Sequence, residues 1–521
     1  MSKDILIGID SGTSVVKSVA FDLSGRQIAA ASVPNRYTVL ADGTASQSLG
    51  QTWEDCTKTL RDLAEKVPNL AERVAALAVT GQGDGTWLID KNGASVGDGW
   101  LWLDSRSAPQ VQRLRAKPED RLRFEKTGAG LNSCQQGAQL AYMQSDMPEL
   151  IDGAETAFHC KDWLYFNLTG ERVVDPSEAS FTFGNYRTSE YDDEVIEILG
   201  LTSRRSMLPP IIDGTKIMHG LSVDAASQTG LLQGTPVSLG YVDVVCTALG
   251  AGIYTKDTNA GCTIVGSTGM HMRATLVQDV QLNEEKTGYV MALPIDGLVA
   301  QIQSNMASTL NIDWMLNVAS DLISDLGVKV THSELLTHVD RWINSGKAGG
   351  MLYHPYISEA GERGPFVSND ARAGFVGLNS SHRFGDMMRG VVEGLGMAAR
   401  DCYEAMGDLP NEVRLTGGAA KSDPLRGILS AVLNRPVRCS SREEAGAAGA
   451  AMMAAVAVGA YERIEDCIDV WVTPLLGSVE TPDPDLADIY DKLFPQYYTA
   501  RQTLSPVWAG LASSQGTGEI E

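Results

Sequence analysis

Residues 5–22 read ILIGIDSGTSVVKSVAFD, two apolar runs separated by a short polar turn. The runs at 5–9 and 15–21 are predicted to be strands, and a third strand is predicted at 27–32 after the Ser24-Gly25 turn. Three short strands joined by small turns indicate an antiparallel meander. The chain therefore opens with strands alone rather than with a strand–helix unit.

An amphipathic helix follows the meander and leads into another strand. Apolar residues recur there at helical spacing, at Trp53, Cys56, Leu60 and Leu63. Residues 74–80 are predicted to be a buried strand that ends in GQGDG at 81–85. Strands and helices in this order predict a mixed α/β layer fold.

A glycine- and hydroxyl-rich turn between strands occurs again just past the middle of the chain. Strands are predicted at 235–241, 261–266 and 270–274, and the last two flank Ser267-Thr268-Gly269. This recurrence predicts two related halves with a boundary near residues 240–252.

The length supports the same division, because 521 residues exceed the about 100–200 residues of a typical domain. We predict one domain at 1–248, a second at 249–510 and a frayed tail at 511–521.

The composition excludes several classes of protein. Hydrophobic residues make up 43% and charged residues 21%, which is typical of a soluble enzyme and excludes wholesale disorder. Lys and Arg total 42 against 65 Asp and Glu, so the formal net charge is −23. A surface this negative repels phosphodiester backbones, and no nucleic-acid partner is expected.

Neither export, a membrane span nor a transition-metal site is expected. The apolar run at 5–9 is too short for a signal peptide, and the run at 447–460 is shorter than the about 20 residues a bilayer requires, so it is predicted to be a buried helix. The eight cysteines lack C-x-x-C spacing, and the seven histidines form no H-E-x-x-H motif. We expect a cytoplasmic protein without a membrane partner.

The turn of the first hairpin has the composition of a phosphate site. Gly12 lets backbone N–H groups approach phosphate oxygens, Thr13 adds a hydroxyl donor, and Lys17 follows nearby. Asp10 at the strand end can hold Mg²⁺ through water. The alternative is an ordinary Asp/Gly turn. The second turn at 266–269 favours the phosphate site, because a triphosphate can be held from two sides.

A family resemblance runs over nearly the whole chain. The blocks that carry it, in order, are IGIDSGTSVVKSVAFD, TGQGDG, WLWLDSRS, KDWLYFNLTGERVVDPSEAS, GYVDVVCTALGAG, AGFVGLNSSHRFGDMMRGVVEG, LTGGAAKSDPLRGILSAVLNRPV and EEAGAAGAAMMAAVAVG. They resemble the FGGY carbohydrate kinases of the actin/hexokinase superfamily. The chain departs from that pattern at Gly390, where Ala or Ser is usual, and at 134–143, where the usual Lys-x-x-Trp element is missing.

The resemblance implies two actin-like (ribonuclease H-like) α/β domains with mixed sheets flanked by helices and a ligand cleft between them. It implies ATP and Mg²⁺ as cofactors, with the polyol mainly on the N-terminal domain and the nucleotide mainly on the C-terminal one. It assigns Asp10 to the metal. The residues that it places against the nucleotide are Asp10, Gly12, Thr13, Lys17, Thr268, Gly269, Gly417, Gly418 and Ala419.

Asp243 is the general base that the resemblance implies. Phosphoryl transfer to an alcohol needs an acceptor for the hydroxyl proton, and a carboxylate after a buried strand can be positioned for it. The alternative is that Asp243 only caps the helix that begins near Val245.

The polyol needs hydrogen-bonding groups and an apolar wall. That set is offered by Gln82, Asp84, Trp102, Asp104, Arg106 and Asp243. Trp102 is equally consistent with a core position. Asp84 is the sharper prediction, because it is a charged residue among glycines that leave room for a ligand.

The residues around Asp84 also bear on the substrate. Gly83-Asp84 stands where xylulose kinases usually carry Met-His and glycerol kinases Arg-Glu. TGQGDGTWLID, GWLWLDSRS and AFHCKDWLYFNLTGER are most similar to the erythritol kinases of the family, which implies transfer to a terminal hydroxyl of erythritol.

Two alternatives stay open. The first keeps the fold and changes the substrate to a ketopentose of the xylulose type or a pentitol. The second is an actin- or Hsp70-like ATPase with a protein partner, which would not need the segments at 82–84 and 102–106. A homodimer is the one assembly kept open.

Overall fold

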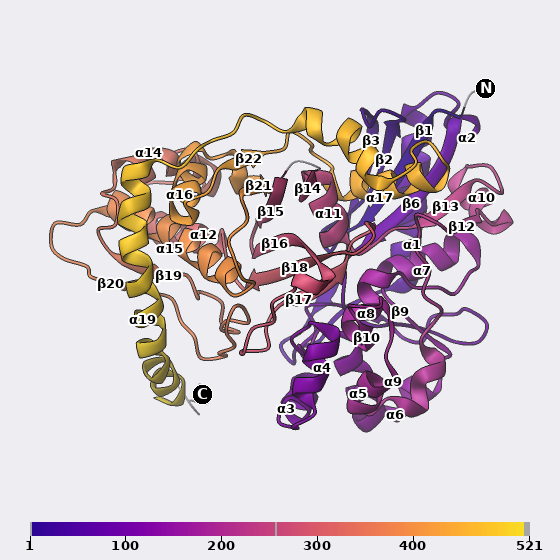
Figure 1. Cartoon of the computed structure of the whole chain (residues 1–521), viewed down its shortest axis with the longest axis horizontal. Coiled ribbons are helices and arrows are strands. Elements are labelled where there is room, and N and C mark those ends of the chain that lie inside the picture. The colour runs from indigo at the N-terminus through magenta and orange to yellow at the C-terminus, as the bar shows by residue number, and fades with distance from the viewer. Residues whose placement is uncertain (1–2, 256–257, 515–521) are drawn as a thin grey trace.

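Each half of the chain builds one mixed β-sheet in the computed structural model, which describes residues 3–255 and 258–514 (Figure 1). The first sheet has six strands in the order β12-β13-β6-β1-β2-β3. Their bounds are β1 Ile5–Ser11, β2 Val15–Asp22, β3 Gln27–Pro34, β6 Val74–Gly81, β12 Met218–Gly220 and β13 Pro236–Leu239. Strand β2 is antiparallel to both β1 and β3, which confirms the predicted meander.

The second sheet repeats this arrangement. Its order is β17-β18-β16-β15-β21-β22, and β14 also pairs with β15. The bounds are β14 Tyr254–Thr255, β15 Thr258–Val265, β16 Gly269–Leu276, β17 Tyr289–Ala292, β18 Leu298–Asn305, β21 Glu412–Thr416 and β22 Val437–Cys439. Strand β15 is antiparallel to β16 and parallel to β21, as β1 is antiparallel to β2 and parallel to β6. The prediction of two related halves is thereby confirmed.

Two helices pack against each other between the sheets, α11 (Asp243–Ala251) and α17 (Ala445–Ala457). A Cβ on Gly449 would lie 2.0 Å from the Cys246 carbonyl oxygen, and a Cβ on Gly8 of β1 would lie 2.0 Å from that of Ala447. Only glycine permits such close approach of two backbones. The predicted buried helix is therefore confirmed for 447–457, whereas 458–460 lie beyond the end of α17. The small residues of the helix serve packing.

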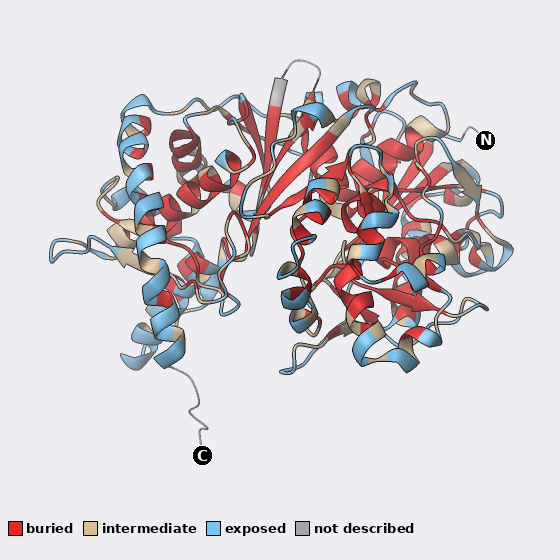
Figure 2. Cartoon of the chain, turned by 60° about the horizontal axis from the view of Figure 1, so that its bottom comes forward, coloured by how far each residue is buried: buried red, intermediate tan, exposed pale blue. Residues whose placement is uncertain are grey.

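The remaining helices cover the outer faces. Helix α1 (Leu49–Lys66) packs on β2 and β3 through the predicted apolar stripe, because Cys56, Leu60 and Leu63 are fully buried. In the second half α15 (Phe384–Glu404) packs on α16 (Asp423–Leu433), and α19 (Pro484–Ser514) lies outside α16. Figure 2 shows that buried residues concentrate in the strands and exposed residues on the outer helices and loops.

Two expectations concern the ends of the domains. The predicted domain boundary at 248/249 falls inside α11. Helix α17 follows the second sheet in sequence but packs on β1 and β6 of the first sheet. The boundary therefore stays a prediction. Residues 511–514 are the last residues of α19, and 515–521 lie outside the described residues, so the expected frayed tail at 511–521 stays a prediction. Among the described helices, none is long and apolar enough to span a membrane.

Candidate active site

The two predicted phosphate turns face the same cavity. Residues 12–14 join β1 to β2, and residues 266–268 join β15 to β16, so each turn sits at the end of a central hairpin. Thr13 and Thr268 both line a cavity with a volume of about 260 Å³. Two hydroxyl-bearing turns from different sheets therefore meet around one space, as clamping a triphosphate requires.

The wall of this cavity combines polar and apolar side chains. Four of the polyol residues predicted from the sequence are among the lining residues, Gln82, Asp84, Trp102 and Asp243. The apolar part of the wall comprises Phe181, Val242, Ile264, Met270, Met291 and Ile302. A few polar groups aimed into a largely apolar space are typical of a small-molecule site.

Asp243 is the first residue of α11, and its side chain lines the cavity. The N-cap of α11 is Val242, so Asp243 is not the residue that caps the helix. Burial, together with the negative charges of Asp10 and Glu178, raises the pKa of Asp243 well above its ordinary value of 3.8. A carboxylate with a raised pKa is a stronger proton acceptor, which suits a general base.

Asp10 lies at the end of β1, opposite Lys17 in the ladder between β1 and β2. Lys17 Nζ donates to Glu444 Oε2 over 2.8 Å, at the residue that caps α17. Burial raises the pKa of Asp10 to about 6, although the Lys17 charge opposes the shift. A Cβ on Gly446 would lie 2.5 Å from Asp10 Oδ2, so only glycine leaves room for this carboxylate.

A hydrogen-bond chain connects the first phosphate turn to the polyol residues. The indole Nε1 of Trp102 donates to Thr13 Oγ1 over 2.7 Å, and Thr13 Oγ1 donates to Gln82 Oε1 over 3.2 Å. Gln82 Nε2 donates in turn to Gln47 Oε1 over 3.0 Å. Trp102 is thus part of the site as well as partly buried.

Asp84 occupies a strained backbone position between two glycines. Its φ is 56°, a left-handed conformation that Asp tolerates better than most residues. Its backbone N–H donates to Glu178 Oε1 over 2.9 Å, and its Oδ2 accepts from Cys134 Sγ at 3.2 Å. Its other oxygen, Oδ1, is buried and has no hydrogen-bond partner within the described part of the chain. That oxygen is available to a ligand hydroxyl.

A buried cluster of charged side chains contacts the loops that carry Asp84 and Asp243. Lys161 Nζ lies 2.8 Å from Asp162, 2.6 Å from Asp175 and 2.7 Å from Glu178. Besides the bond from Glu178 to Asp84, Ser177 Oγ accepts from the backbone N–H of Val242 over 3.0 Å. His159, Asp162 and Glu178 are close enough to ligate a metal, but the Lys161 ammonium already supplies the positive charge there. The cluster is therefore structural and positions the loops of Asp84 and Asp243.

Asp104 and Arg106 are not among the residues that line the cavity, so the polyol contact expected of them stays a prediction. Arg106 Nη2 donates to Asp104 Oδ2 over 2.7 Å, and Asp104 Oδ2 also accepts from the backbone N–H of Ala45 over 2.9 Å. The Arg106 guanidinium stacks 3.5 Å from the centroid of the Trp100 ring. The two charges satisfy each other, and the pair holds the segment that carries Trp102.

The predicted nucleotide segment lies beside the second phosphate turn. Gly417 has a φ of 97°, and a Cβ there would lie 2.5 Å from the carbonyl oxygen of Val265, the residue before Gly266. Gly417 and Gly418 are exposed, and Ala419 is partly buried. Gly269 is buried and lines a small cavity of about 30 Å³ behind the turn. This arrangement leaves exposed backbone next to the turn, where the nucleotide contact is predicted.

Two lining residues that carry polar groups were missed by sequence reasoning, Tyr289 of β17 and Arg363. Arg363 lies in the loop between β19 (Leu352–His354) and β20 (Gly374–Val376), far from the other polar residues in sequence. The segment Gly361-Glu362-Arg363-Gly364-Pro365 places charged residues between glycines, as GQGDG places Asp84, and that pattern was the available signal.

Two related α/β halves with a phosphate-type turn in each are typical of the actin-like superfamily. Residues 5–250 match the N-terminal domain of the FGGY family of carbohydrate kinases, and residues 259–458 match its C-terminal domain. The chain belongs to this family. As a kinase of this class it uses ATP as phosphoryl donor.

Individual relatives span the whole chain. The erythritol kinase of Brucella abortus (strain 2308) is 62% identical over 512 residues, 98% of this chain and 98% of that protein. A xylulose kinase of Staphylococcus epidermidis is 25% identical over 95% of this chain and 96% of that protein. The crystal structure of gluconate kinase from Lactobacillus acidophilus shares the fold, with a TM-score of 0.87 and 22% identity over 97% of this chain and 99% of that one.

Proposed function

We propose that this chain transfers the γ-phosphoryl group of ATP to a terminal hydroxyl of erythritol. The observation that carries the proposal is the cavity that holds Asp243 and Asp84 between the two phosphate turns. The 62% identity to the Brucella abortus erythritol kinase over 98% of the chain supports the choice of acceptor.

Asp243 has the central part in the proposed chemistry. Its carboxylate takes the proton of the reacting hydroxyl while that oxygen forms a bond to the γ-phosphorus. The bond from the γ-phosphorus to the bridging oxygen breaks, and ADP leaves. Backbone N–H groups of the two turns, with Thr13 and Thr268, stabilise the charge that spreads over the phosphoryl oxygens.

Mg²⁺ is the metal that we propose for this site. The residues fit it, because Asp10 presents a carboxylate beside the first phosphate turn and repels the nearby Asp243, so a cation there relieves the repulsion. When bound, Mg²⁺ neutralises charge on the phosphate oxygens. Lys17 supplies a further positive charge, held in place by Glu444.

We place the reaction in the cytoplasm, because all eight cysteines are free in the part of the chain that the structure describes, as in a reducing compartment. Closure of the two halves over the acceptor would exclude water, a competing nucleophile. A homodimer stays a prediction.

An ADP-release assay with Mg·ATP tests the proposed acceptor. The panel holds erythritol, threitol, glycerol, xylitol, D-xylulose and L-xylulose. We expect erythritol to have the highest kcat/KM. Turnover at least tenfold lower for erythritol than for either xylulose would move the assignment to the ketopentose alternative. ATP hydrolysis indifferent to every acceptor would instead favour an ATPase with a protein partner.

A further inference from the structure

Arg363 reaches the cavity from the opposite half of the chain to Asp84. It is one of the cavity-lining residues, and its guanidinium carbon lies 6.0 Å from the centroid of the Trp102 ring. The loop that carries it, between β19 and β20, belongs to the half that forms the second sheet, whereas Asp84 follows β6 of the first sheet. The two charged groups therefore face one space from two separate sheets.

The backbone around Arg363 is held by a carboxylate. Glu362 Oε1 accepts from the backbone N–H groups of Met306 and Arg363, both over 2.9 Å. Burial raises the pKa of Glu362 to about 7. A buried carboxylate that receives backbone donors fixes the loop, so the Arg363 side chain projects from a defined position.

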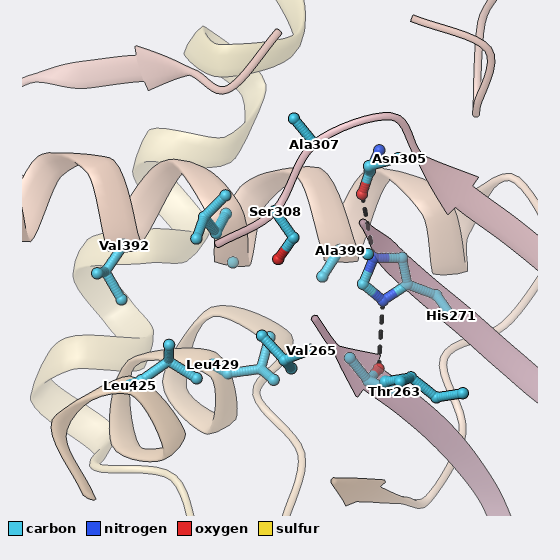
Figure 3. Close-up of a pocket in the computed structure, with 14 residues that line it drawn as sticks. Thr263, Val265, His271, Asn305, Ala307, Ser308, Val392, Ala399, Leu425 and Leu429 are labelled. Atoms are coloured by element: carbon cyan, nitrogen blue, oxygen red, sulfur yellow. Dashed lines mark hydrogen bonds between the residues drawn. The ribbon is translucent and has the colours of Figure 1, made fainter. Parts of the chain in front are cut away.

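The same framework supports the second phosphate turn. Asn305 Nδ2 donates to the carbonyl oxygen of Gly364 over 2.9 Å, and Asn305 Oδ1 is paired with His271, which is also bonded to Thr263 (Figure 3). Three residues further on, the backbone N–H of Ser308 donates to the carbonyl oxygen of Ser267 over 2.7 Å. Residues 305–308 therefore bond to both the loop of Arg363 and the second phosphate turn, and fix the position of one relative to the other.

Arg363 and Asp84 both have hydrogen-bonding capacity that the protein does not use. Within the described residues, Arg363 Nε and Asp84 Oδ1 are buried without a partner, and the two side chains form no ion pair within 4.0 Å. Leaving such groups buried and unpaired is unfavourable. A hydroxyl that lies between them satisfies both, because it donates to the carboxylate and accepts from the guanidinium.

The neighbours of Arg363 show which end of the substrate it faces. Burial raises the pKa values of Asp84, Cys134 and Tyr289, and the nearby positive charge of Arg363 opposes that rise at all three. The charged groups that act on Asp243 are instead Asp10, Glu178 and Lys161. Arg363 thus lies on the Asp84 side of the cavity, near the Cys134 thiol that donates to Asp84.

We propose that Arg363 is a specificity-determining residue that, together with Asp84, binds the hydroxyl of the acceptor farthest from the one that is phosphorylated. This inference rests on the proposed function and deepens it, since the distance from this pair to Asp243 sets the length of polyol that fits. An acceptor held this way also bridges the two halves of the molecule.

The test uses two acceptors that differ only in that remote hydroxyl, erythritol and erythro-butane-1,2,3-triol. For the wild-type protein we expect kcat/KM to favour erythritol by about 30-fold or more, because a site built to bind a hydroxyl rejects the analogue that lacks it. In Arg363→Met the preference should fall to within about threefold, with the KM for ATP changed by less than about twofold. Arg363→Lys, which retains the charge without the planar fork, should be intermediate.

Arg372→Met is the matched control, because Arg372 lies on the same loop, donates to the backbone carbonyls of Asn369 and Ala371, and is not among the cavity-lining residues. It should keep the wild-type preference. If Arg363→Met lowers kcat/KM equally for both acceptors, Arg363 is structural and the inference fails. If wild-type protein does not use erythritol, the proposed function fails, and the same comparison is made with the preferred acceptor and its terminal deoxy analogue. A retained preference in Arg363→Met would then overturn the inference separately.

Discussion

The indole N–H of Trp102 donates a hydrogen bond to the hydroxyl of Thr13 over 2.7 Å. The two residues are 89 positions apart in the sequence and come from different parts of the first domain. One was predicted to cover the polyol and the other to contact phosphate. Their direct contact means that the acceptor side and the nucleotide side of the site share a hydrogen-bond chain, which continues to Gln82.

Trp102→Phe retains the apolar ring and removes the N–H donor. We expect kcat/KM for the acceptor to fall about three- to tenfold, the worth of one neutral hydrogen bond, with a rise of similar size in the KM for ATP. Steady-state kinetics with each substrate varied measures both. Trp314→Phe, on the exposed face of α12 (Leu310–Asp325), is the control. A fall in kcat/KM for the acceptor without a change in the KM for ATP would contradict the shared hydrogen-bond chain.

Asp243→Asn removes the proposed proton acceptor and keeps the shape of the side chain. We expect kcat to fall by at least about 100-fold, the usual worth of general-base catalysis, while the affinity for ATP changes little. Kinetics and calorimetric ATP titration measure the two effects. Asp224→Asn, on the surface of α10 (Val223–Thr229), should match wild type. A variant that keeps more than about a tenth of wild-type kcat would show that Asp243 is not the base.

The pH dependence follows from the raised pKa of Asp243. The carboxylate must be deprotonated to accept the proton, and burial with the charges of Asp10 and Glu178 favours its protonated form. We therefore expect kcat/KM to fall as the pH decreases, with a midpoint well above the 3.8 of an ordinary Asp. Burial also raises the pKa of Asp84, so this residue needs a control. The fall in kcat/KM at low pH should persist in Asp84→Asn. A fall that disappears in that variant would belong to Asp84.

Gly446→Ala tests the position of Asp10. The added Cβ would lie 2.5 Å from Asp10 Oδ2, so the carboxylate must move away from the first phosphate turn. We expect a rise of about tenfold or more in the Mg·ATP concentration needed for half-maximal activity, with a thermal unfolding midpoint near that of wild type. Gly427→Ala in α16 meets nothing within 4 Å and should leave kinetics unchanged. Unaltered kinetics in Gly446→Ala would argue against a metal role for Asp10.

His271 should make the protein less stable in acid. Burial lowers its pKa from 6.5 to about 4, so between these values the unfolded chain binds a proton that the folded protein excludes. The contribution of His271 is therefore fully present above pH 6.5 and is lost as the pH falls toward 4. From pH 7.5 to pH 5 we expect wild type to lose about 2 kcal/mol more than His271→Gln. Denaturant unfolding at both pH values measures this, and equal losses would contradict the neutral, buried imidazole.

Local patterns predicted much of the fold correctly. The meander at 5–34, the amphipathic helix at 49–66 and the hairpin around 266–268 follow from alternation, helical spacing and turn residues, which act between neighbours in the chain. The correspondence between the two halves could be predicted because each half repeats the same order of turn and strand.

The site residues also differ in how well local sequence patterns predicted their positions. Thr13, Asp84 and Asp243 each lie a few residues beyond the end of a strand, β1, β6 and β13 respectively, and this position made them predictable. Asp104 and Arg106 look equally suitable in sequence, but a carboxylate and a guanidinium two residues apart satisfy each other when the backbone turns between them. Sequence spacing does not reveal whether such a pair faces a ligand or itself.

The position of Arg363 could not be predicted from the sequence. The order of strands and the phosphate turns are determined by interactions between residues close in the chain, so the sequence alone predicts them. The meeting of Arg363 with Asp84 across 279 positions depends on how the loop between β19 and β20 packs against residues 305–308, through Glu362 and Asn305. Such long-range packing depends on shape and hydrogen bonding in three dimensions, so it emerges only when the two halves are folded against each other.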